Sequence, residues 1–585
     1  MKAVAFLLSL LVGGAAFAQS SPGIVTGKVY SADQWNAFFA AKLDFAGGGR
    51  FYATGYGVKA DGVTSDDVAF AAAAAACTAV GGTLYLPAGK ILLTGAAQTI
   101  LSNCSLVGSG GLVFGPSPNG TMFYITSTSV SPFVAKGQWS LSRMSFYWPN
   151  QTTGTTVYPP LVKDNGTSES WGTARVSDIT IVNAYDGFVQ SPNTSGGAVQ
   201  FSNATMFAVH DLFRLTNTGD LHQFNQIKIT PGAWLSICGA GCYAAVDVGL
   251  ANSTVFRVAS NGAGGNSVNI TTSKIVVFGA RYLFQIDNGG VLSLSNIDIG
   301  GGSDGIGTII KNTAGGLYTA QNSLSGFVGS CAVVKFSGGA STKVNCFEMG
   351  ATGPLTLDNL FVGGVTGSFI VTASDVTMRN STISSVGSIA DGLDYYAIQM
   401  TAGNGKINVQ GSTLGGRAAD TKVHGIVTTG ATPTTTNITG NYFSSFNDAI
   451  SLQTSPLGMI VANNTSLGTT GSNSVVITGT NGVVYTGNQF DRPPTATTSA
   501  CGAGSSASGA LQGFISVGST NPTNSCNLKL PFVPMGGDAG NCIFQMQGGQ
   551  TVTGTGPSGG PPTWGINFSA TAHSQKISFS CMGIQ

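Results

Sequence analysis

Charged side chains are scarce in this chain. Lys, Arg, Asp and Glu make up 8% of its 585 residues, against roughly 25% in an ordinary soluble domain. The net charge is +1, and no run of Lys or Arg occurs. Nucleic acids and anionic membrane surfaces attract clustered positive charge. We therefore expect neither partner, and we expect outer surfaces that are polar through Ser, Thr, Asn and Gln.

Long apolar runs are lacking except at the N-terminus, so the sequence predicts no internal membrane span. Met1 and Lys2 precede an apolar stretch over residues 3–12, and Ala16-Phe17-Ala18 before Gln19 has the small residues of a cleavage site. This pattern predicts a signal peptide over 1–18 and export to the periplasm or the cell exterior. An N-terminal helix that stays attached is the alternative.

Cysteine is present in an even number, ten, which fits an oxidising compartment. No CxxC motif pairs with another and the four His residues are scattered, so we expect no zinc site. No cofactor is implied, and the residues leave a bound Ca²⁺ open. The spacing suggests the local pairs Cys77–Cys104, Cys238–Cys242, Cys331–Cys346, Cys501–Cys526 and Cys542–Cys581.

Two short helices are predicted near the start of the chain. Residues 31–44, within an N-terminal segment over 19–50, begin with a capping box of Ser31 and Gln34. An alanine-rich helix runs to about Ala79, where Ser65 and Asp66 are expected to cap its N-terminus and Gly81-Gly82 to end it. Its smooth alanine face predicts a lid over the open end of a sheet stack.

From about Leu84 to Phe490 the chain is a series of short strands and turns with no helical period. Asn441, Asn464 and Asn488 recur in similar segments, 23 and 24 residues apart. Such a repeat is typical of a solenoid, in which each coil buries its inward side chains only against its neighbours. We expect roughly 16 coils and a rod about 75 Å long. We also expect Asn to adopt the left-handed conformation at the bends and to stack from coil to coil.

The repeat stops after Arg492-Pro493-Pro494. Residues 493–509 are rich in small residues and are predicted to be a linker. Four alternating segments within 510–585 predict a separate small β-sandwich. The solenoid then covers 51–492, and the fold class is all-β.

These segments resemble a known superfamily. Residues 56–67, the alanine-rich helix and residues 82–89 are similar to the opening of the pectate-lyase-like right-handed parallel β-helix proteins, which include rhamnogalacturonase-type and epimerase-like enzymes and many bacteriophage tailspikes. Residues 32–44 are similar to a segment near the start of tail fibres and tailspikes, and the C-terminal region, closing with 577–583, resembles a terminal module of such spikes. The resemblance implies a single-stranded right-handed parallel β-helix, a homotrimer, and a protein that binds a surface polysaccharide and often cleaves it.

The signal peptide does not fit a phage tail, which assembles in the cytoplasm. Three hypotheses follow. The first is a spike-like surface-polysaccharide binder and depolymerase on a virion tail or of prophage origin. The second is a secreted monomeric polysaccharide lyase or hydrolase. The third is an exported adhesin without catalytic activity.

Catalysis on a solenoid requires side chains stacked from successive coils. Tyr396, His424, Asp448 and Ser474 occupy the same place in consecutive repeats. In-register stacking would place His424 about 5 Å from both Asp448 and Tyr396. Asp394 lies in the same coil as Tyr396.

This patch is the candidate site. Asp394, His424 and Asp448 are the predicted catalytic residues, and two carboxylates on one face suit a glycosidase. For a lyase, His424, Lys422 or Arg417 would abstract a proton beside a uronate carboxyl. The predicted substrate-binding residues are Tyr395, Tyr396, Arg417 and Lys422. The alternative is that His424 and Asp448 form a structural hydrogen-bonded pair. No adjacent Asp-Asp pair of the polygalacturonase type occurs in the coils, and no metal ligand is predicted.

Overall fold

The computed structural model describes residues 49–492 with internal gaps, together with Ser31, Gln34 and the strands between 497 and 581. The gaps within 49–492 are 111–119, 165–170, 191–196, 217–220, 259–265, 288–289, 300–303, 313–321, 334, 338–342, 351–353, 388–390, 402–404, 419, 431–432, 454–458, 472–473 and 479–482. The predicted signal peptide and most of the predicted helix over 31–44 lie outside the described residues. Ser31 and Gln34 do exchange the reciprocal hydrogen bonds of a capping box.

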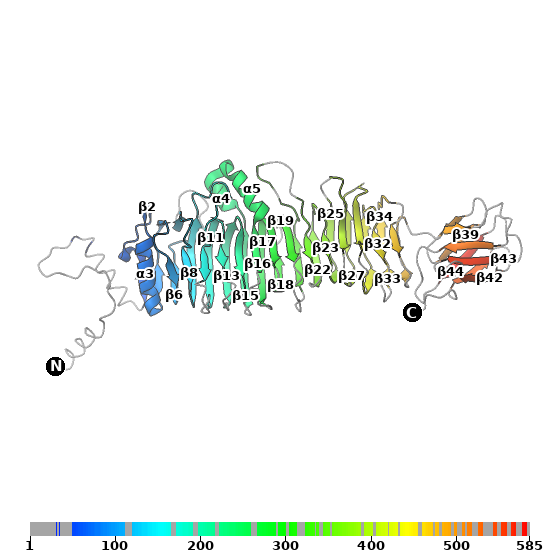
Figure 1. The fold of residues 1–585 in the computed structure, drawn as a ribbon, viewed down its shortest axis with the longest axis horizontal. Helices are drawn as coiled ribbons and strands as arrows, with labels where there is room; N and C mark the ends of the chain where they lie inside the picture. Colours follow the sequence, from blue (N-terminus) through cyan, green and yellow to red (C-terminus); the bar gives the residue numbers. More distant parts are fainter. Residues whose placement is uncertain are drawn as a thin grey trace, which may run out of the picture.

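Residues 50–486 wind into a parallel β-helix, as the sequence predicted (Figure 1). Strands β1 to β36 pair in parallel with strands one coil away, and they stack into three sheets. The first sheet contains β1 Arg50–Tyr52, β3 Thr83–Tyr85, β6 Cys104–Val107, β9 Trp139–Tyr147, β11 Ala174–Ala184, β13 Val199–Ala208, β15 Leu221–Ile229, β17 Asn266–Ile286, β18 Gly290–Ile299, β20 Asn322–Val328, β22 Leu355–Val362, β24 Val376–Arg379, β27 Ile407–Gln410, β30 Thr436–Thr439, β33 Met459–Ala462 and β36 Val483–Thr486.

The second sheet begins with β2 Asp61–Ser65, β4 Gly89–Leu93 and β7 Thr121–Ile125, which joins β9. It resumes from β22 with β25 Thr382–Val386, β28 Thr413–Gly416, β31 Tyr442–Ser444 and β34 Thr465–Leu467.

The third sheet carries the polar clusters discussed below. It contains β5 Thr99–Leu101, β8 Phe133–Ala135, β10 Val162–Asp164, β12 Phe188–Val189, β14 Asp211–Leu215, β16 Thr254–Val258, the end of β17, β19 Asp304–Asn312, β21 Phe347–Met349, β23 Ile370–Thr372, β26 Tyr395–Met400, β29 Val423–Thr428, β32 Ile450–Gln453 and β35 Val475–Thr478.

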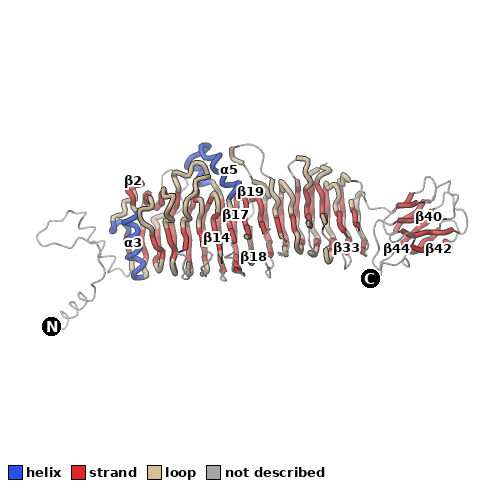
Figure 2. Tube along the Cα trace, viewed as in Figure 1, coloured by secondary structure: helices blue, strands red, loops and turns tan. Residues whose placement is uncertain are grey.

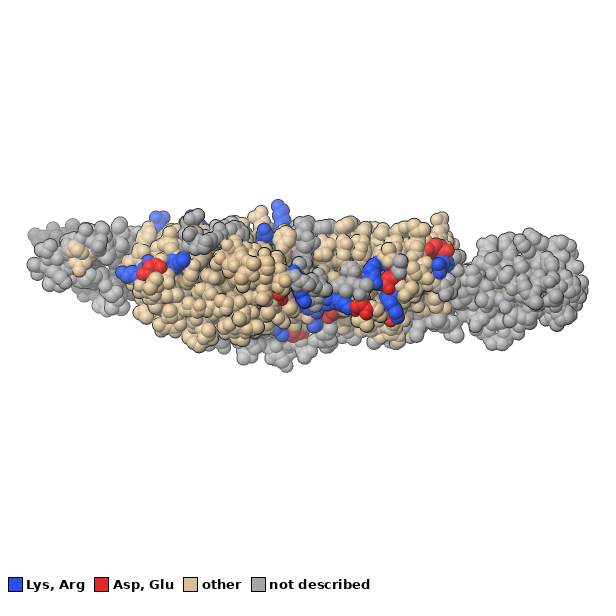
Figure 3. All heavy atoms as spheres, turned by 90° about the horizontal axis from the view of Figure 1, so that it is seen from above, with Lys and Arg blue, Asp and Glu red and all other residues tan. Residues whose placement is uncertain are grey.

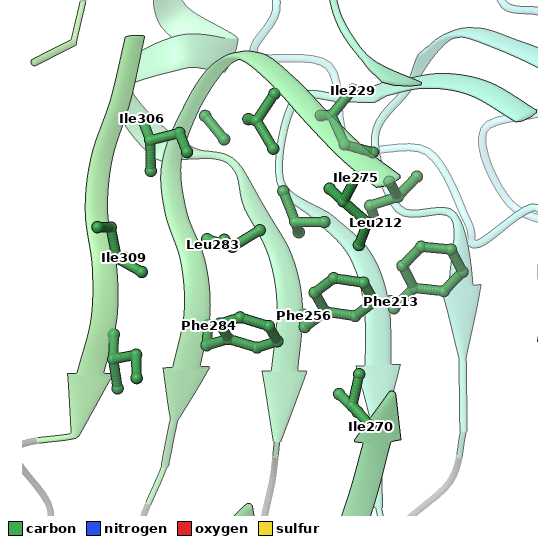
Figure 4. Close-up of a cluster of buried hydrophobic side chains, with 14 of the residues drawn as sticks. Leu212, Phe213, Ile229, Phe256, Ile270, Ile275, Leu283, Phe284, Ile306 and Ile309 are labelled. Atoms are coloured by element: carbon green, nitrogen blue, oxygen red, sulfur yellow. The ribbon is translucent and has the colours of Figure 1, made fainter. Parts of the chain in front are cut away.

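Inward side chains of successive coils stack on one another in the core. Phe188, Phe213, Phe256 and Phe284 are strand partners, and their rings stack at 5.2 to 5.5 Å. Figure 4 shows the rings of Phe213, Phe256 and Phe284 on successive strands. All four are fully buried. Each ring contacts rings of its own coil or of the neighbouring coils, which is the one-dimensional packing expected of a solenoid.

A buried asparagine ladder also confirms the coil-to-coil stacking. Asn441 donates from Nδ2 to Oδ1 of Asn464, and Asn464 donates in the same way to Asn488, both at 3.0 Å. These asparagines are not the left-handed residues, which corrects the sequence expectation. Positive φ belongs to the residue before each of them, Gly440, Asn463 and Gly487. The bend therefore precedes the ladder, and the ladder side chain turns inward to bond the backbone.

The alanine-rich helix is α3, Asp67–Val80, and it follows the 3-10 helix η1, Ala53–Tyr56. Gly81 ends α3 in the left-handed conformation, as predicted. The expected side-chain cap by Asp66 is wrong, because its carboxylate accepts the backbone N–H groups of Lys59 and Leu92 instead. Figure 2 shows α3 at the N-terminal end of the rod. Its role as a lid stays a prediction.

A helical insertion interrupts the coils, contrary to the expectation of strands alone. Helices α4 (Gly232–Cys238), η2 (Gly239–Cys242) and α5 (Tyr243–Asn252) follow one another on the outside of the rod (Figure 1). Within the described chain, 232–252 is the one helical stretch with the length and apolar character of a membrane span. Trp234 and Val246 are nevertheless buried in a cluster with Val182 and Phe207 of the β-helix, so the insertion forms its own small core.

Three of the five predicted cysteine pairs are disulfides: Cys77–Cys104, Cys238–Cys242 and Cys331–Cys346. The pair Cys501–Cys526 includes a residue outside the described ones. Cys542 and Cys581 are antiparallel strand partners, and their side chains are not among those described.

The C-terminal strands form two four-stranded antiparallel sheets. One contains β37 Thr497–Ser499, β40 Ser525–Lys529, β42 Val552–Pro557 and β43 Thr563–Phe568, and the other β38 Ser506–Ser508, β39 Gln512–Ser516, β41 Cys542–Met546 and β44 Lys576–Cys581. Strand β37 lies inside the stretch predicted to be a linker. The face-to-face sandwich and the domain boundaries stay predictions.

The asparagine ladder makes a testable prediction. Replacing Asn464 with Ala removes the acceptor of the Asn441 N–H and one acceptor of Asn441 Nδ2, together with the side-chain donor to Asn488 Oδ1 and the Ile438 carbonyl. Each buried group left unpaired costs about 1–3 kcal/mol, so we expect a clear fall in the denaturant midpoint of the β-helix. Asn437→Ala, one coil earlier and partly exposed, is the matched control. Equal midpoints for the two variants would contradict a stabilising ladder.

Candidate functional site

The strand register brings three predicted residues together on the outer face of the third sheet. Tyr396 of β26 and His424 of β29 are direct strand partners, and their rings stack at 5.3 Å. Asp448 lies one coil further on, where Gly425 N–H donates to its carbonyl oxygen. Nδ1 of His424 lies 2.5 Å from Oδ1 of Asp448. The sequence therefore predicted this juxtaposition correctly.

The imidazole of His424 stands between two carboxylates. Its Nδ1 is bonded to Asp448, and its Nε2 lies 3.7 Å from Oδ1 of Asp394. Lys422 places its Nζ 3.2 Å from the same Asp394 oxygen. Asn447 donates from Nδ2 to Asp448 Oδ1 at 3.1 Å, which helps to fix that carboxylate.

Burial and charge act in opposite directions on His424. Burial disfavours the imidazolium, but the hydrogen bond to Asp448 and the negative charges of Asp448 and Asp394 outweigh it, so the pKa of His424 is raised above 6.5. Burial, followed by the charges of Asp394 and Asp448, raises the pKa of Tyr396 above its ordinary value. The phenol of Tyr396 therefore stays protonated at neutral pH. His424 is the residue of this site whose side chain can gain or lose a proton near physiological pH.

A groove of about 520 Å³ opens over these residues. It is lined by Asp394, Tyr396, His424, Val427, Asn447, Asp448, Ser451, Gly471 and Val476. His424 and Asp448 are mostly covered, with 17% and 13% of their side chains exposed, whereas Asp394 is 46% exposed. A ligand in the groove would meet Asp394 and the edge of His424 first.

Two of the predicted substrate-binding residues lie apart from this groove. Tyr395 is buried in the core, and its hydroxyl donates to Asp391. Arg417 is paired with Asp420. Neither residue lines the groove, so the geometry gives no support to their predicted role. Lys422, in contrast, stands beside the groove with 49% of its side chain exposed.

Sequence reasoning missed Asn447 and Ser451 in the lining, although their spacing from Asp448 would have placed them there. It also treated His210 only as one of four scattered histidines, although Asp186 precedes it by nearly one coil.

A larger groove of about 740 Å³ lies over the first sheet beside Trp139 and Arg175. Arg175 is the one charged residue in its lining, so it offers no acid–base pair.

Comparisons with known proteins add little to this geometry. No family model matches the chain, and no curated protein matches it. Among solved structures, the A-module of a mannuronan C-5 epimerase from Azotobacter vinelandii is 13% identical, with a TM-score of 0.34, and the match covers 76% of this chain and 99% of that one.

Two further solved structures are similar at the same level. The catalytic unit of a GH87 α-1,3-glucanase from Streptomyces thermodiastaticus is 12% identical, with a TM-score of 0.34, over 76% of this chain and 69% of that one. The Dettilon tailspike protein is 11% identical, with a TM-score of 0.31, over 94% and 96%. Likeness at this level carries no argument, and the fold assignment rests on the strand pairing itself.

The electrostatics of the site can be tested by histidine NMR on protein with labelled imidazoles. We expect His424 to titrate above 6.5, and Asp448→Asn to lower its pKa because a carboxylate charge and a strong hydrogen bond are lost. Buried His222, whose pKa is lowered to about 4 by burial, is the internal control and stays unchanged. A His424 pKa that does not respond to Asp448→Asn would contradict the pairing.

Proposed function

We propose that this protein binds a polysaccharide along the outer face of the third sheet and cleaves it at His424. The supporting observation is a titratable imidazole held between two carboxylates at the floor of an open groove. An open groove on a rod accommodates a polymer that continues at both ends, whereas small-molecule sites enclose most of their ligand.

Elimination fits the arrangement better than hydrolysis. Inverting hydrolases leave room for a water between their two carboxyl groups, and retaining ones hold them about 5–5.5 Å apart across the scissile bond. Here the His424 ring fills the space between Asp394 and Asp448. The proton-transfer groups therefore approach a sugar from one side, as removal of a proton beside a uronate carboxyl requires.

Each of these residues would have its own role in the elimination. Neutral His424 accepts the proton from the carbon next to the carboxyl group, and the electron pair forms the new carbon–carbon double bond as the glycosidic C–O bond breaks. The leaving oxygen takes up a proton from water, and the imidazolium of His424 later returns its proton to water. Asp448 fixes the ring through Nδ1 and stabilises the imidazolium that forms. Lys422 would neutralise the uronate carboxylate, which makes the adjacent proton more acidic.

Activity assays on a panel of acidic polysaccharides test this proposal. We expect unsaturated uronate ends to appear and His424→Ala to reduce the rate by about 10²–10⁴-fold, the usual contribution of a general base. Asp178→Asn, which changes a carboxylate on the first sheet bonded to Asn203, is the control and keeps full activity. Products with reducing ends but no unsaturation would contradict elimination, and intact polymer with tight binding would favour an adhesin.

The pH dependence gives a second test. Because His424 must be neutral to accept a proton, the rate should rise as pH increases through its raised pKa. Asp448→Asn lowers that pKa, so the rising limb moves to lower pH while the maximal rate falls. A limb that stays in place in Asp448→Asn would contradict the base role of His424.

We also propose a spike-like homotrimer, exported by the predicted signal peptide or carried on a virion tail. Exposed Phe361, Tyr442 and Leu467 on the strands of the second sheet support a buried contact between copies. Light scattering should then give about three times the chain mass of 59.2 kDa. A monomer would instead favour a secreted single-chain enzyme. The N-terminal residue of the mature protein tests cleavage after Ala18.

A further inference from the structure

A second polar cluster lies on the same face of the same sheet as the His424 groove. A row of strand partners connects Arg214 of β14 to Val427 of β29 through Arg257, Gln285, Lys311, Glu348, Val371 and Gln399. The two places are seven strand spacings apart, roughly 34 Å at about 4.8 Å per step. A polymer lying along the third sheet would therefore pass both.

Carboxylates lie beneath this cluster. Asp211 is fully buried, and Asp186 has only 10% of its side chain exposed. Nδ1 of His210 lies 2.7 Å from Asp186, whose Oδ1 also accepts the N–H of Asp211. Arg214 donates to Asp211 through Nε and a terminal nitrogen, at 2.8 and 2.5 Å. The carboxylates of Asp186 and Asp211 are therefore already paired with the side chains of His210 and Arg214.

The nitrogen donors lie on the solvent side of these carboxylates. The side chains of His210, Arg214 and Arg257 are 30%, 29% and 26% exposed. Arg257 uses Nε for Asp287 and one terminal nitrogen for Asp211. Lys311, two strands further along the same row, contacts the hydroxyl and the ring of Tyr282. The face toward solvent therefore presents N–H donors from four side chains.

The charges in this cluster favour an anion over a metal ion. The hydrogen bond to Asp186 raises the pKa of His210, with burial opposing and the charge of Asp211 assisting. Three carboxylates, Asp186, Asp211 and Asp287, pair with His210, Arg214 and Arg257. Lys311 stands beside its strand partner Glu348, which accepts a hydrogen bond from Asn345. Asp186, His210 and Asp211 could in principle hold a metal ion, but a guanidinium already occupies Asp211 Oδ2.

The cationic side chains occupy one part of the third sheet. The corresponding positions over the His424 groove are the uncharged Val427 and Ser451. In this row the cationic residues lie on β14, β16 and β19, with exposed Lys163 of β10 two strand spacings before Arg214.

We propose that His210, Arg214, Arg257 and Lys311 form an anion-binding site that holds acidic groups of the polysaccharide on the third sheet, between four and seven strand spacings from the His424 groove. The shared chemistry is a carboxylate or sulfate on a sugar. This inference rests on the proposed function only for the identity of the polymer. Arginine forks and lysine are the side chains best suited to such groups.

Binding calorimetry in the His424→Ala background tests this without cleavage. The probes are long-chain oligogalacturonate with its carboxyl-reduced form, and dextran sulfate with neutral dextran, so that carboxylate and sulfate are distinguished. We expect at least one charged probe to bind more tightly than its neutral match. Lys311→Gln should weaken that binding on the order of threefold to tenfold, and Lys311→Arg should restore it.

Lys228→Gln is the matched control, because Lys228 lies on the first sheet over the ring of Phe278. Arg214→Gln, checked for folding by circular dichroism, is the second variant, and it should weaken binding at least as much as Lys311→Gln. Equal binding of charged and neutral probes, equal losses in Lys228→Gln and Lys311→Gln, or binding that requires Ca²⁺ and survives Lys311→Gln would overturn the proposal. If charged probes bind through Lys311 but His424→Ala leaves cleavage unchanged, the proposed function fails and the anion site stands.

Discussion

Parallel hydrogen bonding between successive coils is the constraint on which this structure depends. Each strand can pair only with the strand one coil before and one coil after it, so the register of one pair fixes the register of the next. The stacked rings of Phe188, Phe213, Phe256 and Phe284 and the ladder of Asn441, Asn464 and Asn488 follow from it. Residues far apart in sequence therefore become neighbours at a spacing that the backbone sets.

The same constraint shapes the chemistry on the outer face of the third sheet. His424 receives Tyr396 from the coil before and Asp448 from the coil after, so its ring is stacked, oriented and charged by three different coils. His210 is held in a related way by Asp186, one coil earlier, and by the stacked ring of Tyr185. Charge is scarce on the surface seen in Figure 3 and gathers mainly in one band there. The charged groups around His424 and His210 therefore set the local electrostatic potential with little competition from other charges.

The sequence allowed the fold and the contacts between coils to be predicted where the repeat was regular, and it failed to do so where the repeat was interrupted. The even spacing of the asparagines predicted the coils, and the matching places of His424 and Asp448 in consecutive repeats predicted the contact between them. The helical insertion over 232–252 was hidden because its apolar residues pack against Phe207 and Val182 rather than along one clean helix face. That insertion also separates Phe213 from its partner Phe256 by far more than one regular repeat, so Arg214 and Arg257 could not be aligned from spacing alone. Asp66 was misjudged because a carboxylate beside a helix start usually caps it, whereas here that carboxylate accepts the backbone N–H groups of Lys59 and Leu92.

A crystal structure of the His424→Ala protein with a bound acidic oligosaccharide tests the central claim most directly. The account predicts sugar density along the outer face of the third sheet, with an acidic group at Lys311 or Arg214 and the chain running toward Asp448. Density confined to the groove beside Trp139 and Arg175 on the first sheet would contradict it.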